Sequence, residues 1–89
     1  NKVDYLKKAI QIYVKLTDYG NLKKCYKDLI DHSPNDCKVY ESYGDALANI
    51  GLIEKSKKMY LTAKKYATQD NQLECITNKL SASNTSAAQ

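Results

Sequence analysis

The sequence predicts an all-α fold of five helices, arranged as two helix-turn-helix units followed by one closing helix. Three observations lead to this prediction. Apolar residues recur at intervals of three and four along most of the chain, which is the spacing of one helix face. The chain also matches itself when it is shifted by about 34 residues. Finally, glycine, proline and aspartate stand where this pattern breaks, as they do at helix ends.

The internal repeat is visible in the residues that coincide after this shift. Tyr26 falls on Tyr60, and Asp36 falls on Asp70. Apolar residues also meet apolar residues at four further places: Leu6 and Tyr40, Tyr13 and Leu47, Leu16 and Ile50, Tyr19 and Ile53. Two units follow from this register, residues 3–36 and residues 37–70.

The first unit is predicted to contain two helices. The first of them covers about residues 3–16, and the sequence "TDYGN" at residues 17–21 is predicted to be a turn. The second helix follows and ends near His32. Each of these segments has the length and periodicity of an ordinary globular helix.

The boundary between the units and the next helix carry recognisable stop and start signals. Pro34 cannot continue a helix, and either Asn35 or Asp36 is placed to cap the following one. That helix is predicted over residues 37–50. It ends at Gly51, because glycine is the usual residue just beyond a helix C-terminus.

The remainder of the chain is predicted to hold two more helices and a tail. One helix starts near residue 53 and carries these residues on a single face: Ile53, Ser56, Tyr60, Ala63 and Ala67. Asp70 is placed to cap a fifth helix over residues 71–80. Residues 81–89 have no apolar periodicity and little to bury, so this tail is predicted to be disordered.

Gly44 interrupts the apolar face of the predicted helix at residues 37–50. A glycine inside a helix destabilises it by about 1 kcal/mol relative to alanine. One explanation is that a neighbouring helix approaches this position closely, since glycine has no side chain. The other explanation is that the glycine is simply tolerated there. The residue by itself does not decide between these two explanations.

The second unit resembles the tetratricopeptide repeat, which is a pair of helices with a large residue, then Leu-Gly and Tyr, and later Ala and an aromatic residue. The residues that carry the resemblance are Tyr40, Tyr43, Gly44, Leu47, Ser56, Tyr60 and Ala63. In the first unit the matching residues are Leu6, Ala9, Tyr13, Asp18, Tyr19, Tyr26 and Pro34. An aromatic-rich helix-pair repeat of RNA-processing scaffolds is the nearest rival, but Gly44 and the repeat length favour the tetratricopeptide pattern.

The resemblance implies an α-α superhelix with 71–80 as its closing helix. It also implies that Gly44, Ser56 and Ala63 are the small positions at which two helices approach closely. The first unit is atypical at the corresponding positions, where it has the large residues Ile10, Leu22 and Leu29. We therefore expect its two helices to lie further apart, or to cross at a different angle.

Composition argues against several functional classes. No apolar run approaches the roughly 20 residues of a membrane-spanning helix, and the N-terminus lacks the apolar stretch of a signal peptide. The absence of an initiator Met suggests a fragment of a larger protein. Cys25, Cys37 and Cys75 form no CxxC pair, so we expect free thiols in a cytoplasmic protein, without a metal or a disulfide.

Catalytic function is not expected from this sequence. The single histidine, His32, lies near a helix end, where an imidazole can interact with the last carbonyl groups. Cys25 precedes it by about two helical turns, which is far for a nucleophile and its base. No phosphate-binding loop or nucleophile motif is present, so the sequence predicts neither an enzyme nor a cofactor.

The resemblance implies that the protein binds another protein or peptide in a concave groove lined by the first helix of each unit. In this chain the groove positions are Asp4, Lys7, Gln11, Val14, Lys15, Lys38, Glu41, Asp45, Ala48 and Asn49. Lys7 and Lys15 would favour an acidic part of the ligand, and Glu41 and Asp45 a basic part. The carboxylate clamp of chaperone-binding members is not expected, because one lysine matches its pattern and the chain has no arginine.

Two alternatives concern other surfaces. The second helix of each unit carries a convex stripe of lysines that could bind RNA or an acidic partner: Lys23, Lys24, Lys27, Lys55, Lys57, Lys58, Lys64 and Lys65. The second alternative is self-association, because a repeat array of two units leaves its terminal faces uncovered. The apolar residues expected at those exposed ends are Val3, Tyr5, Leu22, Leu73 and Ile76.

Overall fold

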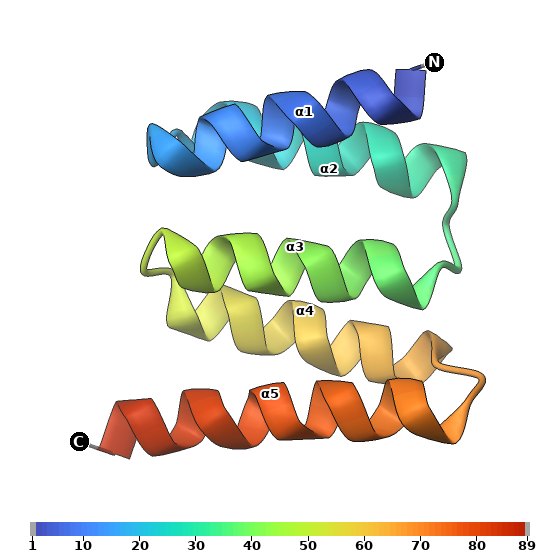
Figure 1. Ribbon diagram of the computed structural model, residues 1–89, viewed down its shortest axis with the longest axis vertical. Coiled ribbons are helices and arrows are strands. Elements are labelled where there is room, and N and C mark those ends of the chain that lie inside the picture. Colours follow the sequence, from blue (N-terminus) through green and yellow to red (C-terminus); the bar gives the residue numbers. More distant parts are fainter. Residues whose placement is uncertain (1, 89) are drawn as a thin grey trace.

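A computed structural model describes the backbone of residues 2–88 and the side chains of residues 2–81. Within these residues the fold is all-α, as predicted, and its helices pack in sequence as antiparallel hairpins (Figure 1). The five helices of this region are α1 (Lys2–Lys15), α2 (Tyr19–His32), α3 (Cys37–Asn49), α4 (Ile53–Tyr66) and α5 (Asp70–Ala88).

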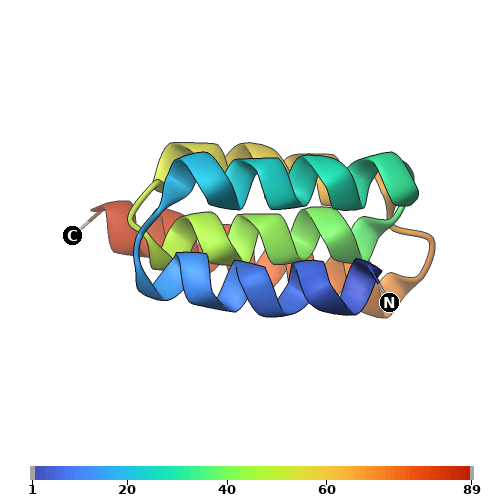
Figure 2. The ribbon, with the colours of Figure 1, turned by 90° about the horizontal axis from the view of Figure 1, so that it is seen from above.

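The helices form two layers. Seen from above, α2 and α4 lie in one row, while α1, α3 and α5 lie in the other (Figure 2). This arrangement places the first helix of each predicted unit, and the closing helix, in the same layer. Residues at equivalent positions of α1, α3 and α5 can therefore contribute to one shared surface.

The turn between α1 and α2 is shorter than the sequence indicates. We predicted a turn over 17–21, but α2 already begins at Tyr19. The reason is Asp18, whose carboxylate accepts hydrogen bonds from the backbone N–H of Asn21 at 3.3 Å and from its side-chain amide at 2.7 Å. This cap satisfies a donor that the first turn of a helix otherwise leaves unpaired, so the helix can start at once.

The signals around α3 act as predicted. Asp36 caps the helix, because its side chain accepts a hydrogen bond from the backbone N–H of Lys38 at 2.9 Å. Gly51 follows the helix with a φ of 89°, a left-handed conformation that glycine adopts without steric penalty. The backbone N–H of Leu52 then donates to the carbonyl of Leu47 at 2.9 Å, which closes the helix end.

The last helix differs from the prediction at both ends. Asp70 is the first residue of α5 and lies in its first turn, where its charge suits the helix dipole, so it is not placed before the helix as a cap. The backbone of α5 also continues past Leu80 to Ala88, because this stretch contains no proline or glycine to end it. The side chains of residues 82–89 lie outside the described part, and disorder of residues 81–89 in solution stays a prediction.

The apolar core is divided between the two ends of the array. One cluster joins α1, α2 and α3, and its buried side chains include Leu6, Leu22, Tyr26 and Leu47. A smaller cluster joins α3, α4 and α5: Cys37, Tyr60, Ala63 and Ile76.

Two expected end residues prove to be core residues. Leu22 and Ile76 are both 0% exposed, so the prediction that they lie on uncovered terminal faces is wrong. Leu22 belongs to the cluster that α1, α2 and α3 share, and Ile76 packs in the cluster with Tyr60. Periodicity correctly identified them as apolar face residues, but could not show that these faces turn inward. Tyr5, by contrast, is 71% exposed, as expected of an uncovered end.

Gly44 marks a close approach between α3 and α4. A Cβ atom at this position would lie 2.6 Å from both Cδ1 and Cε1 of Tyr60, which is closer than real side chains come. The hydroxyl of Ser56 donates to the Gly44 carbonyl at 2.7 Å, and Ala63 is fully buried on the same helix. The explanation of Gly44 by close packing is therefore confirmed, although its nearest neighbour is an aromatic ring rather than a helix backbone.

The first helix pair is packed less closely than the second. More residues of α3 and α4 approach one another than residues of α1 and α2 do. This agrees with the expectation drawn from the large residues Ile10, Leu22 and Leu29, all of which are buried. Larger side chains between two helices hold their backbones further apart.

Candidate binding groove

Two adjoining hollows lie between α1 and α3. The first encloses about 430 Å³ and the second about 350 Å³. Four residues line both of them, so the hollows form one continuous groove: Ile10, Gln11, Tyr26 and Ser42. We call this the α1–α3 groove.

The structure brings together most of the residues that the sequence suggested for a groove. Its lining includes seven of the predicted positions: Lys7, Gln11, Val14, Lys15, Lys38, Asp45 and Asn49. The other three, Asp4, Glu41 and Ala48, do not line either hollow.

Tyr26 and Ser42 are groove residues that sequence reasoning missed. The two hydroxyl groups share a hydrogen bond of 2.7 Å between α2 and α3. The Tyr26 ring also stacks on Tyr43 with a centroid distance of 4.4 Å and an interplanar angle of 6°. Burial raises the pKa of Tyr26 above its usual value, so its phenol stays protonated further into alkaline pH. These contacts fix the floor of the α1–α3 groove.

The first hollow combines apolar walls with two lysines and one carboxylate, that of Asp36 at its edge, which accepts a hydrogen bond from the backbone N–H of Lys38. Lys7 and Lys38 line it from α1 and α3, and both are exposed to solvent. The apolar part of its lining consists of Val3, Ile10, Leu29 and Val39. A ligand with an apolar side chain next to a negative charge would find complementary groups here.

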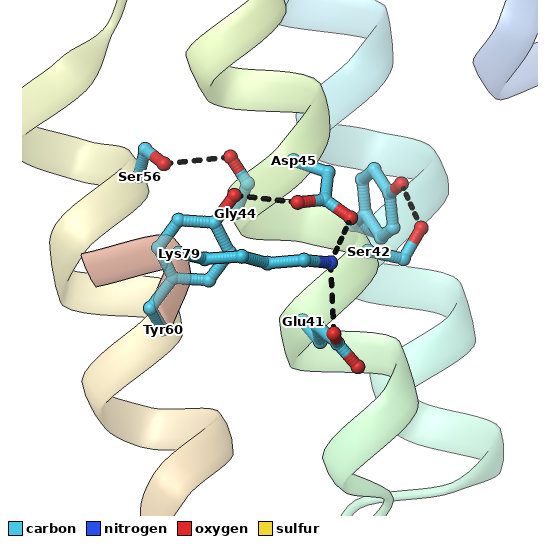
Figure 3. A network of polar contacts seen from close by, with 8 residues as sticks. Glu41, Ser42, Gly44, Asp45, Ser56, Tyr60 and Lys79 are labelled. Atoms are coloured by element: carbon cyan, nitrogen blue, oxygen red, sulfur yellow. Dashed lines mark hydrogen bonds and ion pairs between the residues drawn. The ribbon is translucent and has the colours of Figure 1, made fainter. Parts of the chain in front are cut away.

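The acidic residues of α3 are not free, because a lysine of α5 binds both of them (Figure 3). The Lys79 ammonium lies 2.8 Å from a carboxylate oxygen of Glu41 and 2.8 Å from one of Asp45. Burial disfavours the charge of Lys79, but its hydrogen bonds to Asp45 and Glu41 outweigh this and raise its pKa. Lys79 offsets one of the two carboxylate charges, so the expected acidic half of the groove keeps a single net negative charge.

The sequence contained a signal for Lys79 that unit-by-unit reasoning did not use. Lys79 follows Asp45 by 34 residues, which is one repeat length, so it takes the position of Asp45 on the next helix of the same layer. We predicted residues 71–80 as a closing helix and assigned none of them to the groove floor. Extending the register to α5 would have indicated that Lys79 lies beside Asp45.

Asp45 also joins the groove to the packing around Gly44. The Tyr60 hydroxyl donates a hydrogen bond to Asp45 from α4, on the side of the carboxylate that Lys79 does not occupy. Burial, followed by the hydrogen bond and the charge of Asp45, raises the pKa of Tyr60 to about 12. One carboxylate therefore connects α3, α4 and α5 (Figure 3).

The raised pKa of Tyr60 predicts that the protein becomes less stable at alkaline pH. Above pH 10, the usual pKa of tyrosine, Tyr60 ionises in the unfolded chain but stays protonated in the folded one up to about 12. The unfolded state then binds fewer protons, so the free energy of unfolding falls as the pH rises through this range. Tyr60→Phe should make the fall shallower in urea titrations, and Tyr5→Phe, at an exposed site, is the control. An unchanged slope in Tyr60→Phe would contradict the assignment.

The cysteines are all free thiols. Cys25 and Cys37 are buried, and Cys75 is exposed on α5. Burial raises the pKa of Cys25 and of Cys37, which disfavours the reactive thiolate. Within the part of the chain that the structure describes, no cluster of His, Cys, Asp and Glu side chains could hold a metal ion.

The convex lysines belong to the layer of α2 and α4. Two of those on α4 lie over aromatic rings: the Lys55 ammonium is 5.8 Å from the centroid of Tyr19, and that of Lys65 is 5.6 Å from the centroid of Tyr66. Such contacts favour a positive charge above the ring face. These two lysines are thus held against the protein itself.

Comparison of the chain with protein-family models, with curated proteins and with solved structures found no match. Among the described helices, none has the length and apolar content needed to cross a membrane.

Proposed function

We propose that the chain is a protein-protein interaction module of the tetratricopeptide type, which holds a peptide or helix of another protein in the α1–α3 groove. In this proposal it is part of a larger cytoplasmic scaffold or adaptor and has no catalytic activity or cofactor. One observation carries the proposal. Residues at the ligand-binding positions implied by the resemblance, on two helices far apart in sequence, line a single continuous groove.

The chemistry of the groove narrows the proposed ligand. Lys7, Lys15 and Lys38 are exposed along it, whereas Glu41 and Asp45 are engaged by Lys79. We therefore revise the charge order that the sequence suggested. The ligand is acidic where it meets α1, and a basic residue of the ligand near α3 would have to compete with Lys79 for its carboxylates.

Charge reversal distinguishes this groove from the convex lysine face. Lys7→Glu combined with Lys15→Glu should slow association with the natural partner by about tenfold, since exposed charges steer encounter more than they hold the complex. The partner would first be isolated by affinity capture with the intact chain, and its association rate then measured by surface plasmon resonance. Binding should also weaken moderately with added salt.

The matched control is a double reversal on α4, Lys58→Glu with Lys64→Glu. Both lysines are exposed and carry the same charge as the groove pair. This variant should associate as fast as the unmodified chain. If it loses the partner while the groove variant keeps it, the protein binds RNA or an acidic partner through its convex face, and the proposed groove function is wrong.

A further inference from the structure

A second apolar surface lies on the outer side of α1, away from the groove. Of the four large hydrophobic side chains exposed in the described part of the chain, three belong to this helix or directly follow it: Tyr5 at 71%, Ile12 at 56% and Leu16 at 65%. The backbone N–H of Leu16 donates to the carbonyl of Ile12 at 3.0 Å, so Leu16 continues the helical pattern. None of the three lines either hollow of the groove.

These residues follow the spacing of a coiled-coil seam. With the half-buried Ala9, they stand at positions i, i+4, i+7 and i+11, which correspond to alternating d and a positions of a heptad repeat. Such residues lie in one line along a helix and accept the matching seam of another helix. We call Tyr5, Ala9, Ile12 and Leu16 the α1 seam.

Two lysines border the α1 seam on its open side. In the same register Lys8 and Lys15 occupy consecutive g positions, seven residues apart, and both are exposed. The e positions on the other side are Leu6, which is buried in the core, and Tyr13, which packs against it. The charged border of the seam is therefore entirely basic.

This border argues against a second copy of the chain as the occupant. In an antiparallel pair of α1 seams, the g positions face one another, so Lys8 and Lys15 would oppose lysines of the other copy. In a parallel pair they would oppose e positions, which here are taken up by the core. Like charges placed opposite each other disfavour association.

We propose that the α1 seam docks an amphipathic helix of another protein, whose apolar seam is bordered by acidic residues spaced seven apart. The apolar residues of the two helices interlock, and the acidic residues pair with Lys8 and Lys15. This surface meets the α1–α3 groove only at Lys15, which borders both, and the docking does not depend on the function proposed for the groove. The protein would then hold two segments, one on each side of α1.

A synthetic peptide can test this docking directly. The probe is a fluorescently labelled three-heptad peptide with Leu at every a and d position and Glu at every e and g position. Its control has Lys in place of each Glu. Repulsion between like charges keeps either peptide from pairing with itself at neutral pH. Fluorescence anisotropy with the full chain should show binding of the Glu peptide, and at least about tenfold weaker binding of the Lys peptide.

Variants of the chain locate the binding. Ile12→Ser combined with Leu16→Ser should weaken binding of the Glu peptide by about tenfold or more, and circular dichroism checks that these exposed substitutions leave the fold intact. Leu61→Ser is the matched control, because Leu61 is as exposed as Ile12, at 56%, but lies on α4. Lys8→Glu should lower affinity for the Glu peptide and raise it for the Lys peptide.

Five results would overturn the proposal, four of them with the peptides or the chain in solution and the fifth with a groove variant. The first four are no binding of the Glu peptide, equal binding of both peptides, unchanged binding by the seam variant, and a dimer in sedimentation velocity that Ile12→Ser dissociates. Such a dimer would make a second copy the occupant. Lys38→Glu distinguishes the α1 seam from the groove. If Lys38→Glu abolishes binding of the Glu peptide and the seam variant does not, the peptide lies in the groove and the α1 seam is not its site.

Discussion

Gly44→Leu is expected to lower the free energy of unfolding by about 1–3 kcal/mol or more. Even a Cβ atom would lie 2.6 Å from two ring atoms of Tyr60. The ring cannot move aside easily, because it is buried and its hydroxyl is bound to Asp45. A leucine would thus force α3 and α4 apart, and would also disturb the hydrogen bond from Ser56 to the carbonyl of residue 44.

Gly20 provides a matched control for this substitution. It also lies within a helix, but a Cβ atom added there would have Asp18 Oδ1 as its nearest neighbour, at 3.8 Å, an ordinary contact distance. Gly20→Ala should therefore leave stability unchanged or raise it by up to about 1 kcal/mol, through helix propensity alone. Urea unfolding of both variants measures the difference. Equal stability of Gly44→Leu and the unmodified chain would contradict the close approach.

Leu22→Ala is expected to destabilise the protein by about 2–5 kcal/mol, a large part of the stability of a small domain. Leu22 is 0% exposed within the cluster shared by α1, α2 and α3, so its removal leaves a cavity that surrounding residues fill only in part. Its loss should loosen α1, which supplies one wall of the groove.

The control for this cavity is Leu61→Ala, which makes the same chemical change at a site that is 56% exposed. Surface substitutions of this kind usually change stability by less than about 0.5 kcal/mol. Thermal or urea unfolding of Leu22→Ala and Leu61→Ala then compares the same substitution at a buried and at an exposed site. A small effect of Leu22→Ala, similar to that of Leu61→Ala, would mean that Leu22 lies at an uncovered end of the array, as the sequence suggested.

The helices were predictable because the local signals along the chain agree with one another. Asp36 and Gly51 delimit α3 through their own backbone and side-chain chemistry, so no knowledge of the neighbouring helices is needed. The role of Gly44 followed from the small residues expected at the same interface. The predicted turn before α2 is longer than the observed one. The sequence "TDYGN" contains turn-forming residues, but here they serve as the cap and the first turn of the helix.

Other features depend on contacts between helices, and the sequence could not provide these. The burial of Leu22 and Ile76 is decided by which neighbour covers them. Lys79 pairs with Glu41 and Asp45 from a different helix, so the charge of the groove could not be judged from its own positions. Tyr26 contributes to the groove from α2, a helix that the resemblance does not assign to the groove floor.

Site-specific photo-cross-linking tests most directly whether the α1–α3 groove holds a partner. A benzophenone side chain would replace Gln11, which is exposed and lines both hollows. In a second protein it would replace Lys58 on α4, which is also exposed. Irradiation of each with the isolated partner should cross-link the partner to position 11 and not to position 58. Cross-linking at position 58 alone would contradict the groove and place the partner on the convex lysine face.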